Sequence, residues 1–223
     1  MNTVIIVAGG SGNRFKSEIP KQFIELNEKP ILMHSIIAFY KYHNNIEIIV
    51  VLPKPQIDYW HSLCKKHNFN IKHRVVNGGK TRFESVKNGL YTIKQSQNLI
   101  AIHDGVRPLV NQNTIERCFK EAEISGNAIP TILPVDSVRQ ISKDTNISID
   151  RSKLSLIQTP QVFKIDILKK AYKQKYKESF TDDASVIEEM GEKINLVEGN
   201  RENIKITNSI DLVMAEALYH HSK

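Results

Sequence analysis

The sequence predicts an α/β fold with a mostly parallel sheet and helices on both of its faces. Apolar, strand-like segments alternate with helix-like segments from Val4 to Val135. The strand-like segments are continuously apolar, which is typical of strands buried on both faces of a parallel sheet. Polar loops that contain glycine follow three of these strands. Such loops meet at the carboxyl edge of a parallel sheet, where α/β proteins bind their ligands.

The alternation can be followed element by element through the first half of the chain. Segments rich in Ile and Val predict strands, because β-branched side chains favour extended backbone. One helix has a defined start, since Thr81 and Glu84 have the spacing of a capping box. The expected order is strand 4–7, helix 31–43, strand 46–52, helix 57–67, strand 72–76, helix 81–93, strand 99–103, helix 114–124 and strand 128–135.

The pattern changes at residues 136–158, where apolar residues are spread among polar and charged ones. A turn-like segment, residues 143–146, divides this stretch and predicts a protruding β-hairpin arm. An isolated two-stranded hairpin is only marginally stable in water. We therefore expect the arm to pack on a second copy of the chain. The alternative is an arm that folds back on its own domain.

Regular structure is expected again after the arm. No linker, repeat or low-complexity segment divides the chain, and 223 residues with 40% hydrophobic content suit one substantial core. We expect a single domain, residues 1–223, in which residues 136–158 form the dimerisation arm. The remaining expected elements are helix 164–177, helix 181–191, strand 194–197 and helix 208–220.

Composition limits the compartment and the partners. No apolar run reaches the roughly 18 residues of a membrane span, and no secretory signal precedes the first strand. Cys64 and Cys118 lack metal or redox spacing, which is typical of reduced cysteines in the cytoplasm. The net charge of +7 favours anionic partners. Dispersed lysines, 7% aromatic content and the lack of known DNA- or RNA-binding patterns argue against nucleic acid.

The turn after the first strand is the most informative segment. Glycines at positions 9, 10 and 12 let backbone N–H groups approach an anion closely, and Arg14 and Lys21 follow them. The spacing matches neither a Walker loop nor the dinucleotide fingerprint. By itself this turn could be a tight strand-to-helix connection. Arg14 together with Pro20-Lys21-Gln22 favours a phosphate site for a nucleoside triphosphate.

An ordered set of short segments resembles the 2-C-methyl-D-erythritol 4-phosphate cytidylyltransferase family over essentially the whole chain. The resemblance implies a Rossmann-like nucleotidyltransferase fold, a homodimer with exchanged arms, CTP as donor and a magnesium ion. The matching segments are the glycine turn, Pro20-Lys21-Gln22, His103-Asp104 with Arg107-Pro108, Asp136-Ser137, Asp150-Arg151, Thr159-Pro160-Gln161, residues 181–185, Val197-Glu198-Gly199 and residues 203–207.

The implied reaction joins a polyol phosphate to the α-phosphorus of CTP and expels pyrophosphate. A phosphate monoester has a second pKa near ~6, so the nucleophile is already anionic at neutral pH and needs no general base. Catalysis then requires cations placed around anionic reactants. By resemblance, Arg14 and Lys21 hold the triphosphate and the leaving group, and Lys205 steadies the α-phosphorus. His103 is interpreted as a structural hydrogen-bonding residue rather than a base.

The resemblance also implies binding residues. The backbone cradle consists of Ala8, Gly9, Gly10 and Gly12, and the contacts to cytosine and ribose come from Gly79, Lys80 and Ser85. An acidic residue is frequent in the family where Lys80 stands, so its contact is expected from the backbone. Asp104 and Arg107 bind the polyol, with Asp104 also a candidate magnesium ligand. Ser137 occupies a substrate-binding hydroxyl position that is often threonine in the family. Arg151 and Thr159 are expected on the arm, where they reach the substrate phosphate in the partner's site.

Three other functions stay open from the sequence. A D-ribitol-5-phosphate cytidylyltransferase performs the same chemistry on a similar polyol phosphate. A sugar-1-phosphate nucleotidyltransferase is disfavoured by its longer glycine turn. A catalytically inactive nucleotide-binding module would not need the three cations, Arg14, Lys21 and Lys205.

Overall fold

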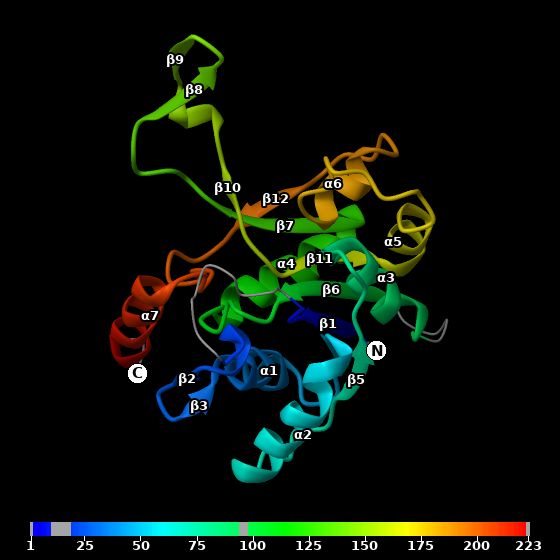
Figure 1. Cartoon of the computed structure of the whole chain (residues 1–223). Coiled ribbons are helices and arrows are strands. Elements are labelled where there is room, and N and C mark those ends of the chain that lie inside the picture. The colour runs from blue at the N-terminus through cyan, green and yellow to red at the C-terminus, as the bar shows by residue number, and fades with distance from the viewer. Residues whose placement is uncertain (1, 10–18, 94–97, 222–223) are drawn as a thin grey trace.

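The computed structural model describes residues 2–9, 19–93 and 98–221. Eight strands form one central sheet in the order β10-β7-β11-β6-β1-β4-β5, with β12 beside β7 (Figure 1). Their bounds are β1 Thr3–Val7, β4 Glu47–Leu52, β5 Arg74–Asn77, β6 Leu99–Asp104, β7 Asn127–Ile132, β10 Leu156–Ile157, β11 Gln161–Lys164 and β12 Leu196–Glu198.

The parallel core of this sheet is as predicted. β1 runs parallel to β4 on one side and to β6 on the other, and β5 continues the parallel set beyond β4. Ile5 of β1 aligns with Ile49 and Ile102 in this register. All three are fully buried, which explains why these strands are continuously apolar.

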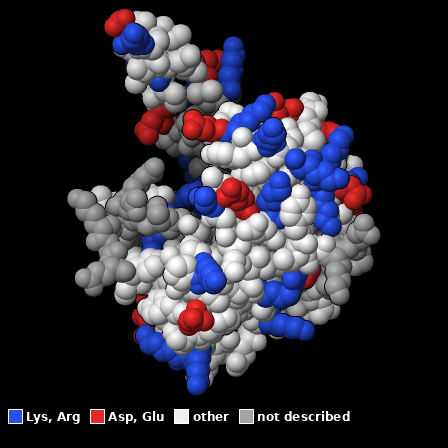
Figure 2. Space-filling view, turned by 45° about the vertical axis from the view of Figure 1, so that its right-hand side comes forward, with Lys and Arg blue, Asp and Glu red and all other residues white. Residues whose placement is uncertain are grey.

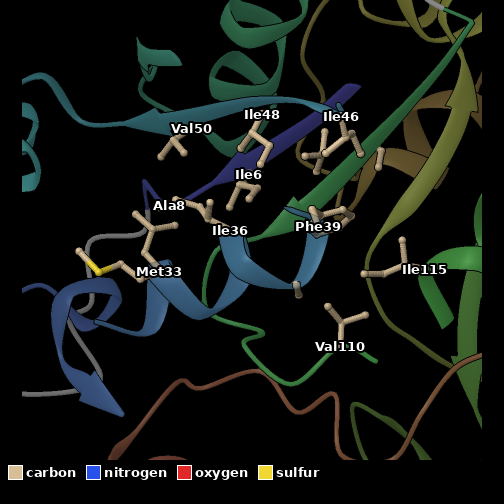
Figure 3. Packing of buried hydrophobic residues seen from close by; sticks show 14 of the residues in the cluster. Ile6, Ala8, Met33, Ile36, Phe39, Ile46, Ile48, Val50, Val110 and Ile115 are labelled. Atoms are coloured by element: carbon tan, nitrogen blue, oxygen red, sulfur yellow. The ribbon is translucent and has the colours of Figure 1, made fainter. Parts of the chain in front are cut away.

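Helices cover both faces of the sheet, as predicted. Successive β1 side chains point to opposite faces: Val4 and Ile6 pack in one core cluster and Ile5 in another. Figure 3 shows the first cluster, in which Ile6 lies near Ile36 of α1. The first cluster is covered by α1 Ile31–Tyr42, α2 Ile57–Lys66 and α4 Gln112–Ser125, and the second by α3 Arg82–Tyr91, α5 Ile165–Ala171 and α6 Asp183–Glu188.

A third, smaller cluster fixes the C-terminal helix. α7, Ser209–His221, lies beside the short hairpin of β2, Glu25–Leu26, and β3, Lys29–Pro30. Leu26 and Ala215 are both fully buried in this cluster. The loop that leads into α7 is thereby held against the body.

The start of α3 confirms the capping box. The Thr81 hydroxyl accepts a hydrogen bond from the Glu84 backbone at 3.1 Å, and the Glu84 carboxylate accepts one from the Thr81 backbone at 3.2 Å. These bonds satisfy two of the donors that a helix N-terminus leaves unpaired. They also fix the loop that precedes α3.

Two sequence-based assignments were wrong. Residues 161–164 were not predicted as a strand, yet β11 lies antiparallel between β6 and β7 and makes the sheet mixed. Four residues are too few to show a periodicity. The helix expected over residues 164–177 ends at Ala171. Lys205 lies in the loop between β12 and α7.

The arm stands apart from the body (Figures 1 and 2). It contains an antiparallel hairpin of β8, Val138–Ser142, and β9, Thr145–Ile149. Its expected end at residue 158 differs from the structure, because β10 has already rejoined the sheet by pairing with β7. Ile141 and Ile147 on the hairpin are 83% and 56% exposed. Packing of this hairpin on a second copy stays a prediction.

The surface of the body is rich in basic side chains. Figure 2 shows Lys and Arg spread over the visible face rather than gathered in one stripe. Cys64 and Cys118 are both free thiols, with Cys118 buried in the core. Across the described part of the chain, we find no helix with the length and apolar character that a bilayer crossing requires.

Candidate functional site

A cleft of about 300 Å³ opens at the carboxyl edge of the parallel strands. It brings together the loops that follow β1, β5 and β6, as the sequence predicted. The short 3-10 helix η1, Lys21–Phe23, and the loop before α7 close its other sides. The site residues predicted from the sequence that line this cleft are Ala8, Gly9, Lys21, Gly79, Lys80, Ser85, Asp104 and Lys205.

Three cations surround the carboxylate of Asp104, the last residue of β6. Its Oδ2 lies 3.0 Å from Lys205 Nζ and 3.3 Å from Arg107 Nε, and its Oδ1 lies 3.6 Å from Arg82 Nε. Burial by itself would raise the pKa of this carboxyl. The three positive charges outweigh burial and hold the pKa well below its usual range. Asp104 is therefore anionic at neutral pH.

Arg82 also lines the cleft, although the sequence analysis did not select it. Its NH2 group donates to Asp183 Oδ2 at 2.6 Å, and the Tyr172 hydroxyl donates to Oδ1 of the same carboxylate at 2.5 Å. Burial, followed by the charge of Asp183, raises the pKa of Tyr172 well above its ordinary value. The sequence analysis could not predict this pairing, because Arg82 and Asp183 are 101 residues apart and an arginine near the start of a helix is common.

A hydrogen-bonded chain of buried groups supports the backbone of Asp104. His103 Nε2 lies 3.0 Å from the Arg107 carbonyl, which must accept, so Nε2 carries the proton. His103 Nδ1 then accepts from the Thr159 hydroxyl at 3.0 Å, and the Thr159 oxygen accepts from the Asp104 N–H at 3.1 Å. Burial lowers the pKa of His103 to about 4, so the ring is neutral. These contacts agree with a structural role for His103.

Thr159 is the site residue whose expected place on the arm was wrong. It is 5% exposed, lies in the body between β10 and β11, and already uses its hydroxyl as donor and acceptor. The sequence could not separate arm from body here, because the return of the chain to the sheet through β10 is only two residues long.

The loop before α3 is tied to the helix through backbone donors. Gly79 N–H donates to the Ser85 hydroxyl at 3.1 Å, and Lys80 N–H donates to the Glu84 carboxylate at 2.6 Å. A Cβ at Gly79 would lie 2.2 Å from Glu84 Cβ, so this close approach requires glycine. The loop is therefore a rigid wall of the cleft.

The remaining predicted site residues are either outside the described residues or away from this cleft. Arg14, Gly10 and Gly12 fall outside the described residues. Ser137 and Arg151 are exposed where the chain enters and leaves the β8–β9 hairpin, and Arg151 donates to the Val135 carbonyl. Neither of these two lines the cleft of its own chain.

The protein groups around Asp104 do not complete a magnesium site by themselves. No cluster of three or more His, Cys, Asp or Glu side chains occurs within residues 2–9, 19–93 and 98–221. Both oxygens of Asp104 already face cations. A magnesium ion prefers several oxygen ligands, often including phosphates. Asp104 as a metal ligand stays a prediction from the sequence.

Comparison with known proteins identifies the family of this chain. The sequence profile of 2-C-methyl-D-erythritol 4-phosphate cytidylyltransferase matches residues 2–221. The enzyme of that name from Bacteroides fragilis is 50% identical over 216 residues, which cover 97% of this chain and 98% of that protein. The one from Porphyromonas gingivalis is 45% identical and covers 96% of each chain.

Solved structures give the same result for the fold. The crystal structure of 4-diphosphocytidyl-2C-methyl-D-erythritol synthase from Anaerococcus prevotii has a TM-score of 0.84 at 27% identity and covers 98% of both chains. The 2-C-methyl-D-erythritol 4-phosphate cytidylyltransferase of Thermus thermophilus has a TM-score of 0.79 at 27% identity, with 99% of this chain and 100% of that chain covered. This chain belongs to the 2-C-methyl-D-erythritol 4-phosphate cytidylyltransferase family.

Proposed function

We propose that this chain transfers CMP from CTP to 2-C-methyl-D-erythritol 4-phosphate, giving 4-diphosphocytidyl-2-C-methyl-D-erythritol and pyrophosphate. The observation that carries this proposal is the cleft at the carboxyl edge of the sheet. There Lys21 and Lys205 flank the glycine-bearing loops at Gly9 and Gly79. Family membership supports the same donor and acceptor.

The reaction needs positioned charge rather than proton abstraction. An oxygen of the acceptor phosphate attacks the α-phosphorus of CTP. The bond from this phosphorus to the oxygen that bridges to the β-phosphorus breaks, and pyrophosphate leaves with that oxygen. The attacking phosphate is anionic at neutral pH. His103 is buried and hydrogen-bonded through both ring nitrogens, which suits a structural group and not a base.

Each cation has a proposed place in this reaction. Lys21 and Arg14 would hold the triphosphate and stabilise the charge on the departing pyrophosphate. Lys205 would approach the α-phosphorus, because its side chain is 41% exposed and reaches the cleft from the loop before α7. Preorganised cations of this kind act where charge develops in the transition state.

The neutral and acidic groups would select the substrates. Asp104, anionic between its cations, would accept hydrogen bonds from the hydroxyl groups of the polyol, with Arg107 beside it. Ala8, Gly9, Gly79 and Ser85 line the cleft and would contact the cytidine part of CTP. A magnesium ion would need oxygens of the triphosphate among its ligands, because the described protein groups do not complete a site for it.

The arm is proposed to complete the site of a second copy. Arg151 is exposed directly after the β8–β9 hairpin, and an arginine can bind a phosphate through two parallel hydrogen bonds. The exposed Ile141 and Ile147 give the hairpin apolar surface that a partner chain would cover. We propose a homodimer in which Arg151 binds the acceptor phosphate in the partner's site.

The test is a paired assay. The purified chain is incubated with CTP and Mg²⁺ and with either 2-C-methyl-D-erythritol 4-phosphate or D-ribitol 5-phosphate, and pyrophosphate release is followed. We expect a clear preference for the methylerythritol substrate. Faster turnover of ribitol phosphate would overturn the proposed acceptor. Binding of CTP without turnover of either phosphate would instead indicate a non-catalytic nucleotide-binding module.

A further inference from the structure

The two oxygens of Asp104 face different cations. Lys205 and Arg107 both contact Oδ2, at 3.0 and 3.3 Å, whereas Arg82 faces Oδ1 at 3.6 Å. Two cations on one oxygen do not fix the plane of a carboxylate, because rotation about its terminal torsion costs little. The charge of Arg82 beside Oδ1 holds the carboxylate in one orientation.

Arg82 can hold this orientation because it is itself anchored. Its NH2 group makes a charge-assisted hydrogen bond of 2.6 Å with Asp183, whose side chain is fully buried. The Asp183 backbone N–H in turn donates to Gln161 at 3.0 Å, so the anchor is joined to β11 in the sheet. The Arg82 guanidinium therefore contacts the buried Asp183 carboxylate through Nη2 and faces the Asp104 carboxylate through Nε.

We infer that Arg82, held by Asp183, is a positioning residue that sets the orientation of Asp104 for the acceptor polyol. This role rests on the proposed function, since it assumes an acceptor with hydroxyl groups for Asp104 to bind. Oδ2 is engaged by Lys205 and Arg107, whereas Oδ1 has only the longer contact with Arg82, so Oδ1 is the oxygen expected to accept hydrogen bonds from the acceptor. Arg82 acts on the acceptor only through Asp104 and makes no bond in the reaction.

Loss of the Arg82 side chain is expected to weaken binding of the acceptor but not of CTP. Loss of the Arg82 contact leaves Asp104 with Lys205 and Arg107, and its carboxylate can rotate so that each cation takes one oxygen. The acceptor then loses its hydrogen-bond partner. The walls at Gly79 and Ser85, proposed for cytidine, do not depend on that rotation, because their hydrogen bonds run to each other and to α3.

Arg82→Lys is the first variant to measure. An ammonium is a point charge that keeps a cation beside the buried Asp183, but it lacks the second nitrogen that faces Asp104. The double variant Arg82→Gln/Asp183→Asn is the second, because it removes both charges and leaves no unpaired buried ion. Tyr172→Phe is the matched control, since it removes a hydrogen bond from the same Asp183 carboxylate and keeps its charge.

The assay is pyrophosphate release, with 2-C-methyl-D-erythritol 4-phosphate varied at saturating CTP and CTP varied at saturating acceptor. We expect both Arg82 variants to raise KM for the acceptor by at least about tenfold, with KM for CTP within about twofold of the parent chain. Tyr172→Phe should lower the melting temperature and leave KM for the acceptor within about twofold.

Several outcomes would overturn the inference. They are an unchanged acceptor KM in a folded Arg82 variant, an equal rise of KM for both substrates, and an equal rise in Tyr172→Phe. If neither Arg82 variant folds, the pair serves the fold and the positioning role is rejected. If the parent chain releases no pyrophosphate with this acceptor, it is the proposed function that fails.

Discussion

The Nζ atom of Lys205 lies 3.0 Å from Oδ2 of Asp104. The lysine belongs to the loop between β12 and α7, and the aspartate ends β6 in the centre of the sheet. The neighbouring Ile206 is fully buried, and its N–H donates to the Val106 carbonyl at 2.9 Å, so this loop is fastened to the one that follows β6. A late segment of the chain thus presents a cation at the edge of the parallel strands.

Replacing this cation tests whether charge drives the transfer. We expect Lys205→Ala to lower kcat by about 10²–10³, because one preorganised transition-state donor contributes about 3–4 kcal/mol. Lys120→Ala is the control, since Lys120 forms an exposed ion pair with Glu116 on α4, away from the cleft. Pyrophosphate release at saturating substrates gives kcat. A loss of less than about threefold in Lys205→Ala would contradict the proposed role.

The neutral state of His103 predicts a pH dependence of stability. The unfolded histidine binds a proton near pH ~6.5, but the folded one does so only near its pKa of about 4. Between these values the unfolded state holds more protons, so the free energy of unfolding falls as the pH drops through this window, by up to about 1 kcal/mol per pH unit.

The variant His103→Gln should remove this contribution. Urea unfolding of both proteins at about pH 5 and about pH 7 gives the comparison. We expect the parent chain to lose more stability than the variant on acidification, even where both change because of other groups. Equal losses in the two proteins would show that His103 does not titrate differently on folding.

The shared site predicts complementation between two inactive homodimers. Arg151→Ala and Lys21→Ala should each be nearly inactive, because each removes a cation from every site. After subunit exchange, each heterodimer contains one site with both cations, so an equal mixture should reach about a quarter of the parent activity. No recovery after exchange has been demonstrated by differently tagged chains would reject the exchanged arm.

The close packing of Gly79 against Glu84 predicts that a side chain at residue 79 weakens CTP binding. Gly79→Ala would place a Cβ 2.2 Å from Glu84 Cβ, which neither backbone can tolerate without movement. We expect a rise in KM for CTP and a lower melting temperature. Lys80→Ala is the comparison, because the backbone hydrogen bond from residue 80 to Glu84 survives it. A larger change of KM for CTP in Lys80→Ala would contradict a contact made by the backbone.

The parallel half of the fold could be predicted because its signals are local. Isoleucine- and valine-rich strands, the Thr81 capping box and glycine-bearing loops each identify an element without reference to distant residues. β11 could not be predicted in this way. Its place between β6 and β7 depends on long-range pairing, for example of Val162 with Ala101 and Ala128.

The same distinction applies to the site. The loops at Gly9, Gly79 and Asp104 were predicted to converge because parallel strands place their carboxyl ends at one edge, and they do. The pairing of Arg82 with Asp183 joins the starts of two helices from distant parts of the chain, and no spacing rule indicates it. Thr159 was misplaced for the same reason, since its neighbours are distant in sequence.

The stem of the arm has a further consequence. The chain leaves the sheet after Ile132 and returns at Leu156, and these two residues are paired neighbours in β7 and β10. Residues 133–155, which include the arm, therefore form one long connection between two neighbouring antiparallel strands. A short turn could join the two strands without disturbing their register. The length and shape of the arm can therefore vary among related chains without any change in the cleft at the carboxyl edge of the sheet.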